Sequence, residues 1–200
     1  MNKVIIGLLA VALFFGCGQS DSEKSVQPTA QQVTSDKKQE VAQKNQSIEK
    51  KKSSIEFTLK TIDNKTFHFV EIPNGFKIKE LEGKNIFLVF FGHQCPPCLR
   101  EIPRLIEMQK EHKDLAIIAI EVQGLSTQQL QEFVKAKGIN YNVISMGSSM
   151  RFINYIQAKA GWNGSIPFLI TFNKEGKVVI IHTGGLFKEH LEQAYAQTNK

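Results

Sequence analysis

Cys95 and Cys98 are two of the chain's three cysteines, and only two prolines separate them in the stretch FFGHQCPPCLREIP, residues 90–103. Cysteines at this spacing can form a structural disulfide, supply half of a metal site, or work as a redox couple. A structural bridge is the weak alternative, because closing so short a loop removes little entropy from the unfolded chain. A structural zinc site needs a second ligand pair, and the third cysteine lies far upstream. We therefore predict a redox couple, with no metal site and no cofactor.

The predicted elements around the cysteines fit that chemistry. Residues 86–91 form an unbroken apolar run, which is typical of a strand buried on both faces, and a helix through about residue 111 follows. The cysteines thus lie at the carboxyl end of a strand, where α/β sheets place their chemistry. The helix dipole and free N–H groups stabilise a thiolate in the first turn, so Cys95 is the candidate nucleophile. Cys98, one turn on, is the candidate thiol that resolves the mixed disulfide.

The two intervening residues predict the direction of electron flow. Pro96 and Pro97 have no N–H, so only the amides of Cys98 and later residues can donate to the Cys95 sulfur. No histidine between the cysteines adds a positive charge. The thiolate should be only moderately stabilised, which predicts a reductant with a potential nearer to thioredoxin's, about −270 mV, than to DsbA's, about −120 mV.

Strands and helices alternate over the rest of residues 55–200, which predicts one α/β domain. Residues 55–59 and 66–70 alternate with period two on either side of a turn and predict a β-hairpin. Ser126 and Gly138 mark the start and end of one helix. The remaining predicted strands are 115–122, 141–145, 168–172 and 178–182, and the predicted helices are 127–137, 148–159 and 187–197.

The first seventeen residues predict export. A short cationic start is followed by the apolar run 4–15, which is too short to span a bilayer and reads as a signal segment. The segment ends in Gly16-Cys17, and a small residue directly before a cysteine resembles a bacterial lipobox. We expect Cys17 to be lipidated and to become the mature N-terminus. An ordinary signal peptide or an uncleaved anchor are the alternatives, and each places the domain outside the cytoplasm.

Residues 18–54 are polar and contain almost no large apolar side chain, which predicts a disordered linker between the signal at 1–17 and the domain at 55–200. The formal net charge of +6 comes with lysines clustered in this linker among acidic residues. No arginine-rich or aromatic-interleaved stripe follows, so the charge indicates a solvated tail and no nucleic-acid partner.

Several motifs together resemble the thioredoxin-like family of membrane-tethered extracytoplasmic thiol-disulfide oxidoreductases, the TlpA/ResA/CcmG type. The matching pieces are FTLKTIDNKTF at 57–67, the strand before C-x-x-C, Glu101-Ile102-Pro103, Ser165-Ile166-Pro167-Phe168, and Asn173-Lys174-Glu175-Gly176-Lys177. The resemblance implies a thioredoxin-like fold, with a central mixed β-sheet flanked by helices and an N-terminal β-hairpin. It also implies that Pro167 is a cis-proline against the cysteines and that the backbone of Ile166 pairs with substrate. The alternative is a proline that merely starts a strand.

The resemblance assigns proton handling near the cysteines to Glu101, one helical turn past Cys98. The alternative is an ordinary acid favoured by the helix dipole. His93 either lies near the thiolate, where its positive charge lowers the thiol pKa, or is a solvated loop residue. The family usually has Trp directly before the first cysteine, where this chain has Gln94. The resemblance therefore does not define the substrate-docking surface.

The implied partners are disulfide-containing client proteins, among them apocytochrome c, and a membrane thiol reductant of the CcdA/DsbD type. Cytochrome c maturation and general disulfide repair are both compatible with the sequence. A peroxiredoxin-like enzyme needs Thr or Ser three residues before the attacking cysteine, and that position is Gly92. A Sco-like copper module uses C-x-x-x-C with a distal histidine; this spacing is one residue short, although His182 lies late in the chain. A DsbA-like oxidase is disfavoured by the two prolines and by the lack of an inserted helical domain.

Overall fold

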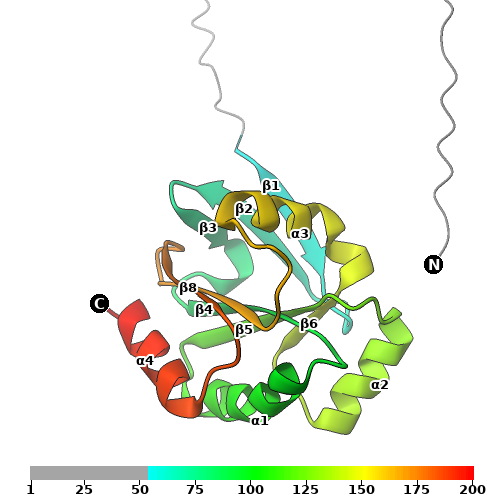
Figure 1. Cartoon of the computed structure of the whole chain (residues 1–200). Coiled ribbons are helices and arrows are strands. Elements are labelled where there is room, and N and C mark those ends of the chain that lie inside the picture. The colour runs from blue at the N-terminus through cyan, green and yellow to red at the C-terminus, as the bar shows by residue number, and fades with distance from the viewer. Residues whose placement is uncertain (1–53) are drawn as a thin grey trace, which may run out of the picture. The chain divides into compact units, whose positions relative to one another are not determined.

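A computed structural model describes residues 54–200 of the chain (Figure 1). The predicted signal at 1–17, the lipidation candidate Cys17 and all of the predicted linker except Ser54 lie outside the described residues. In the part of the chain that the structure describes, no helix has both the length and the apolar character needed to cross a membrane.

A five-stranded sheet forms the centre of the domain, in the order β6-β5-β4-β7-β8. Its strands are β4 (Asn85–Phe91), β5 (Leu115–Glu121), β6 (Asn142–Ser145), β7 (Phe168–Phe172) and β8 (Val178–Thr183). The sheet is mixed, because β4 and β6 run parallel to β5 whereas β7 runs antiparallel to β4 and β8. Every residue of β4 is buried, as its unbroken apolar run predicts. This central strand carries the chain directly to the cysteines.

A second, antiparallel sheet precedes the central one. It consists of β1 (Glu56–Lys60), β2 (Thr66–Ile72) and β3 (Gly75–Ile78), and the short 3₁₀ helix η1 (Lys79–Leu81) follows it. The sequence prediction contains the pairing of β1 with β2 but misses β3. The turn into β3 uses a left-handed backbone at Asn74, with φ of 60°, and the strand has only four residues. So short a run gives a weak periodic signal.

Four α-helices complete the domain: α1 (Pro96–Glu111), α2 (Thr127–Lys137), α3 (Met146–Ala160) and α4 (Lys188–Thr198). The predicted ends of α2 are confirmed. The Ser126 side chain accepts from the backbone N–H of Gln129, the Gln129 side chain accepts from the N–H of Ser126, and Gly138 ends the helix at a φ of 64°.

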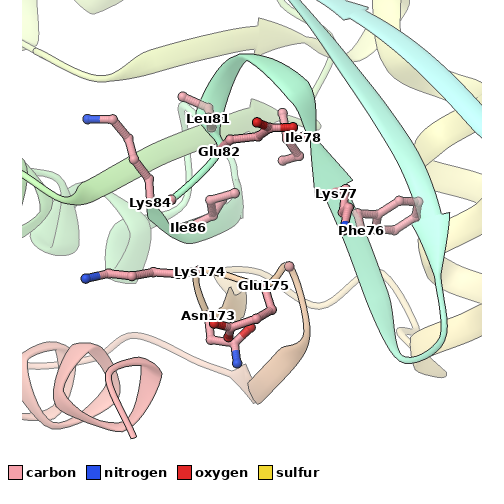
Figure 2. Close-up of a pocket in the computed structure, with 12 residues that line it drawn as sticks. Phe76, Lys77, Ile78, Leu81, Glu82, Lys84, Ile86, Asn173, Lys174 and Glu175 are labelled. Carbon is pink, nitrogen blue, oxygen red and sulfur yellow. The ribbon is translucent and has the colours of Figure 1, made fainter.

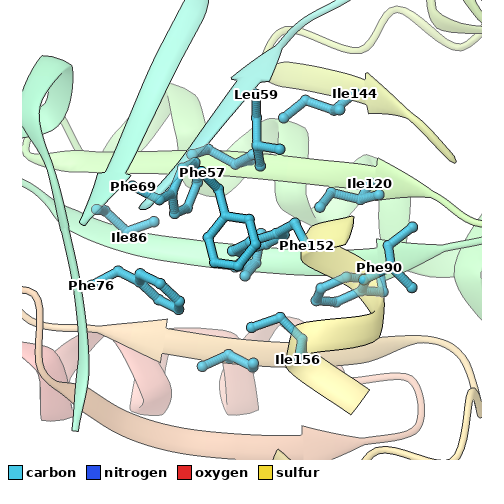
Figure 3. Packing of buried hydrophobic residues seen from close by; sticks show 14 of the residues in the cluster. Phe57, Leu59, Phe69, Phe76, Ile86, Phe90, Ile120, Ile144, Phe152 and Ile156 are labelled. Atoms are coloured by element: carbon cyan, nitrogen blue, oxygen red, sulfur yellow. The ribbon is translucent and has the colours of Figure 1, made fainter. Parts of the chain in front are cut away.

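The central sheet is covered on both faces, and the side chains of β4 alternate between the two cores. One core lies between the sheet, the β1–β3 sheet and α3, where Phe90 of β4 joins Phe57, Phe69 and Phe152 (Figure 3). The other core lies against α1, α2 and α4 on the opposite face (Figure 1). Cys95 and Cys98 belong to this second core, so a packed layer fixes the cysteine pair from behind.

Candidate active site

The two cysteines lie at the start of α1 and are joined in a disulfide. Cys95 is the N-cap residue, with φ −92° and ψ 109°, and its Sγ accepts from the N–H of Cys98 at 3.3 Å. That amide is the first one available, because the two prolines fill the first helical positions. Cys95 is 7% exposed and Cys98 is 1% exposed. Cys95 is therefore the sulfur that a partner can reach more easily, and Cys98 lies behind it.

Ile166 and Pro167 lie against the cysteine pair. The peptide bond between them is cis. The Sγ of Cys95 lies 3.8 Å from the carbonyl oxygen of Ile166, and the carbonyl of Pro167 accepts from the N–H of Gly184 at 2.8 Å. The next glycine, Gly185, packs so closely that an added Cβ would lie 3.4 Å from the Cβ of Pro97. Three separate loops thus meet at the disulfide.

Glu101 is buried one turn beyond Cys98 on α1, with 3% of its surface exposed. Its Oε1 accepts a single hydrogen bond, from the N–H of Leu186 at 3.2 Å. Burial raises the pKa of Glu101 to about 7, although the Leu186 N–H and the nearby charge of Arg104 pull it in the other direction. A carboxyl group with this pKa exchanges its proton near neutral pH.

Glu101 and Arg104 both bind the backbone of Leu186. Arg104 donates from Nη1 to the carbonyl oxygen of Leu186 at 2.7 Å, while the N–H of the same residue donates to Glu101. The two contacts attach the loop after β8 to the first turns of α1. Burial, and to a lesser extent the charge of Glu101, raises the pKa of the Tyr141 hydroxyl.

Glu121, at the end of β5, is a site residue that the sequence prediction misses. It is fully buried, and its carboxylate accepts from the backbone N–H groups of Gln123, Gly124 and Leu125 at 2.9, 3.1 and 3.1 Å. Nδ1 of His93 lies 2.9 Å from Oε1 of the same carboxylate. The solvated-loop interpretation of His93 is wrong, because its side chain is 19% exposed and pairs with a buried acid.

The loop between β4 and Cys95 is closely packed at Gly92. A Cβ there would collide with the Gln123 side chain and would lie 2.7 Å from Cδ1 of Ile166. The Gln123 side chain in turn accepts from the N–H of Gln94 at 2.8 Å. The Thr or Ser that a peroxiredoxin-like site needs at position 92 would therefore require the Gln123 and Ile166 side chains to move.

Two other features of the described residues lie apart from the cysteines. A cavity of about 370 Å³ separates the β3–η1 segment from the β7–β8 turn (Figure 2), but Lys84 and Lys174 at its rim already bind a backbone carbonyl and Asp114. Glu111, His112 and Glu192 place three potential metal ligands together at the far end of α1, but Glu111 is exposed and pairs with Lys188. His182, the distal histidine of the copper alternative, lines a groove between β8 and α4.

Comparisons with known proteins agree with this geometry. Thiol-disulfide oxidoreductase ResA of Halalkalibacterium halodurans is 30% identical over 118 residues, a match that covers 58% of this chain and 64% of that protein. The chain thus spans a little under two thirds of the length of this relative.

Solved structures share the fold. StoA from Bacillus subtilis superposes with a TM-score of 0.53 at 20% identity, covering 70% of this chain and 95% of that one. A thioredoxin family thiol:disulfide interchange protein from Chlorobium tepidum has a TM-score of 0.56 at 23% identity, covering 72% and 94%. The AhpC/TSA family model matches residues 51–181, which include the cysteine pair and Pro167. The chain therefore belongs to the AhpC/TSA family and has a thioredoxin-like fold.

Proposed function

We propose that the protein is a thiol-disulfide oxidoreductase that reduces disulfides in exported proteins through Cys95 and Cys98. The observation that carries the proposal is the placement of Cys95 at the start of α1, 3.8 Å from the Ile166 carbonyl, with Cys98 buried behind it. The relative from Halalkalibacterium halodurans is named a thiol-disulfide oxidoreductase, which supports this class of reaction.

The reaction takes two thiol–disulfide exchanges. The Cys95 thiolate attacks one sulfur of the client disulfide, forms a mixed disulfide and releases the other client sulfur as a thiolate. Cys98 then loses its proton and attacks Sγ of Cys95, which releases the second client sulfur. The client gains two electrons, and the cysteine pair ends in the disulfide state that the structure contains. An external dithiol must return the two electrons for a second cycle.

Glu101 is the group that we assign to the proton of Cys98. The two residues are three positions apart on α1, so their side chains lie on the same face of the helix. A carboxyl group with a pKa of about 7 can accept the proton when Cys98 attacks and return it when the pair is reduced again.

Trapping of clients tests the proposal. In Cys98→Ser the mixed disulfide on Cys95 has no resolving thiol, so client proteins should remain covalently attached and separate on treatment with reductant. The double variant Cys95→Ser with Cys98→Ser is the matched control and should trap nothing. Recovery of no thiol-linked protein by Cys98→Ser would contradict the proposal.

We further propose that the domain works outside the cytoplasm, anchored through a lipid on Cys17, with apocytochrome c among its clients and a CcdA/DsbD-type membrane dithiol as electron donor. The apolar segment and Gly16-Cys17 support the anchor. Cys17→Ala should shift the protein from the membrane fraction to the soluble fraction if the lipid is the anchor. Unchanged membrane association would favour an uncleaved apolar anchor.

A further inference from the structure

A groove of about 370 Å³ runs between β8 and α4 and begins at the loop that touches the cysteine pair. Its apolar lining comes from Ile180, Leu186, Phe187 and Ala194, and its polar lining includes His182 and His190. None of the residues lining it is an acid. A groove of this composition suits a neutral, largely apolar occupant.

Phe187 stands at this groove and is the most exposed large hydrophobic side chain among the described residues, at 59%. The guanidinium of Arg104 lies 4.7 Å from the centre of its ring, a cation–π contact. Arg104 is itself fixed by its hydrogen bond to the carbonyl of Leu186. The aromatic ring is therefore held in place before a partner arrives, which lowers the entropic cost of binding through it.

The groove is continuous with the redox site. Gly185 lines the groove and packs against Pro97, which lies between the cysteines. A Cβ added to Gly185 would lie 3.9 Å from Cγ of the cis-proline Pro167. The groove also shares Leu186 with Glu101, through the 3.2 Å hydrogen bond. The Gly185 end of the groove is therefore within reach of a polypeptide whose cysteine is attached to Cys95.

We propose that Phe187 and the β8–α4 groove are the docking surface for the client segment that flanks the attacked disulfide, and that they select a large aromatic or aliphatic side chain beside the client cysteine. This inference rests on the proposed function. Hot spots at protein interfaces are enriched in large aromatic residues (Trp and Tyr) and in Arg, and this surface pairs an exposed aromatic ring with Arg104. The surface supplies an exposed aromatic two residues beyond Gly185, the glycine that packs against Pro97.

The test uses the full chain, reduced beforehand, and three oxidised substrates. Two are disulfide peptides that differ only in Phe or Ser beside the cysteine, and the third is glutathione disulfide. The wild-type protein should reduce the Phe peptide with a larger second-order rate constant than the Ser peptide. In Phe187→Ala the ratio of the Phe-peptide rate to the glutathione rate should fall about tenfold, the scale of losing a dominant interface aromatic. Phe187→Tyr should restore most of that ratio.

Met150→Ala is the matched control, because Met150 is also exposed, at 40%, but lies on α3, on the opposite face of the sheet. Its ratio should equal that of the wild type. The docking proposal is overturned if Phe187→Ala leaves the ratio unchanged, or if Met150→Ala lowers it as much. A wild-type protein that reduces none of the three substrates would overturn the proposed function itself, a result distinct from reduction without dependence on Phe187.

Discussion

Two glutamates are buried near the cysteine pair, and the chain surrounds them differently. Glu101, 3% exposed, follows the pair on α1 and accepts one backbone hydrogen bond. Glu121, fully buried, accepts from three backbone N–H groups of the loop after β5, and its fourth partner, His93, lies in the loop that precedes the pair. Both positions take a carboxylate out of water, which costs free energy unless hydrogen bonds or charges offset it.

The number of hydrogen-bond donors distinguishes a carboxyl group that can exchange a proton from one that supports the structure. The single donor at Glu101 leaves burial as the largest influence, and the pKa rises to about 7. The three hydrogen bonds to the Glu121 carboxylate attach residues 123–125 to the end of β5. The Gln123 side chain in turn accepts from the N–H of Gln94, next to Cys95. We therefore expect Glu101 to move protons and Glu121 to position the loop.

Removal of Glu121 should have the largest effect on stability. Glu121→Ala leaves three backbone N–H groups and His93 without their acceptor in a buried site, which should lower the free energy of unfolding by about 4 kcal/mol. Denaturant unfolding measures this, with the exposed Glu132→Ala as the matched control, expected to change stability by less than about 0.5 kcal/mol. Equal losses of unfolding free energy in the two variants would contradict a structural role for Glu121.

The raised pKa of Glu101 makes stability depend on pH. The folded-state pKa of about 7 lies above the ordinary carboxyl value of 4.5, so the folded state binds the proton more tightly than the unfolded state. The stabilisation that this tighter proton binding gives to the folded state is fully present below about pH 4.5. It is lost as pH rises to about 7, which lowers the free energy of unfolding by about 3 kcal/mol. Between pH 5 and 8 the unfolding free energy of the wild type should fall relative to that of Glu101→Gln, which has no carboxyl group to titrate at this position. If the unfolding free energies of the two proteins changed with pH in the same way, the raised pKa of Glu101 would be contradicted.

Glu101→Gln should also slow disulfide reduction. The amide keeps an acceptor for the Leu186 N–H but cannot take the proton of Cys98, so the rate at pH 7 should fall about tenfold. The wild-type rate should show an inflection near pH 7 that the variant lacks. The exposed Glu107→Gln, on the same helix, is the control and should keep both rate and inflection. An inflection that survives in Glu101→Gln must come from another group.

The smallest effect is expected at His93. His93→Gln removes one of the partners of Glu121 and leaves the three backbone donors in place, so the free energy of unfolding should fall by only about 1 kcal/mol. Thermal or denaturant unfolding of this variant beside Glu121→Ala orders the two effects. A loss as large as that of Glu121→Ala would make the histidine the principal support of the loop.

Local patterns predict the parts of this site that neighbouring residues build. The apolar run of β4, the helix start at Cys95 and the caps of α2 each follow from a few consecutive residues. Glu121 shows the limit. In sequence it is a polar residue ending an apolar strand, and nothing local indicates a histidine 28 positions earlier or a chain that turns back onto its carboxylate.

The groove shows the same limit on a longer scale. Arg104 and Leu186 are 82 residues apart, and their hydrogen bond exists only because α1 and the loop after β8 cover the same side of the sheet. The family resemblance supplies Pro167 and Glu101 as candidates. The surroundings that raise the pKa of Glu101 require the tertiary structure.

The reduction potential of the Cys95–Cys98 pair tests the central claim most directly. The two prolines leave the amide of Cys98 as the donor to the Cys95 sulfur, so the thiolate receives modest support and the reduced pair should be a good electron donor. Equilibration with glutathione or dithiothreitol buffers, followed by quantification of free thiols, should give a value nearer to thioredoxin's, about −270 mV, than to DsbA's, about −120 mV. A value above about −180 mV, in the range of oxidising members, would contradict a reductase.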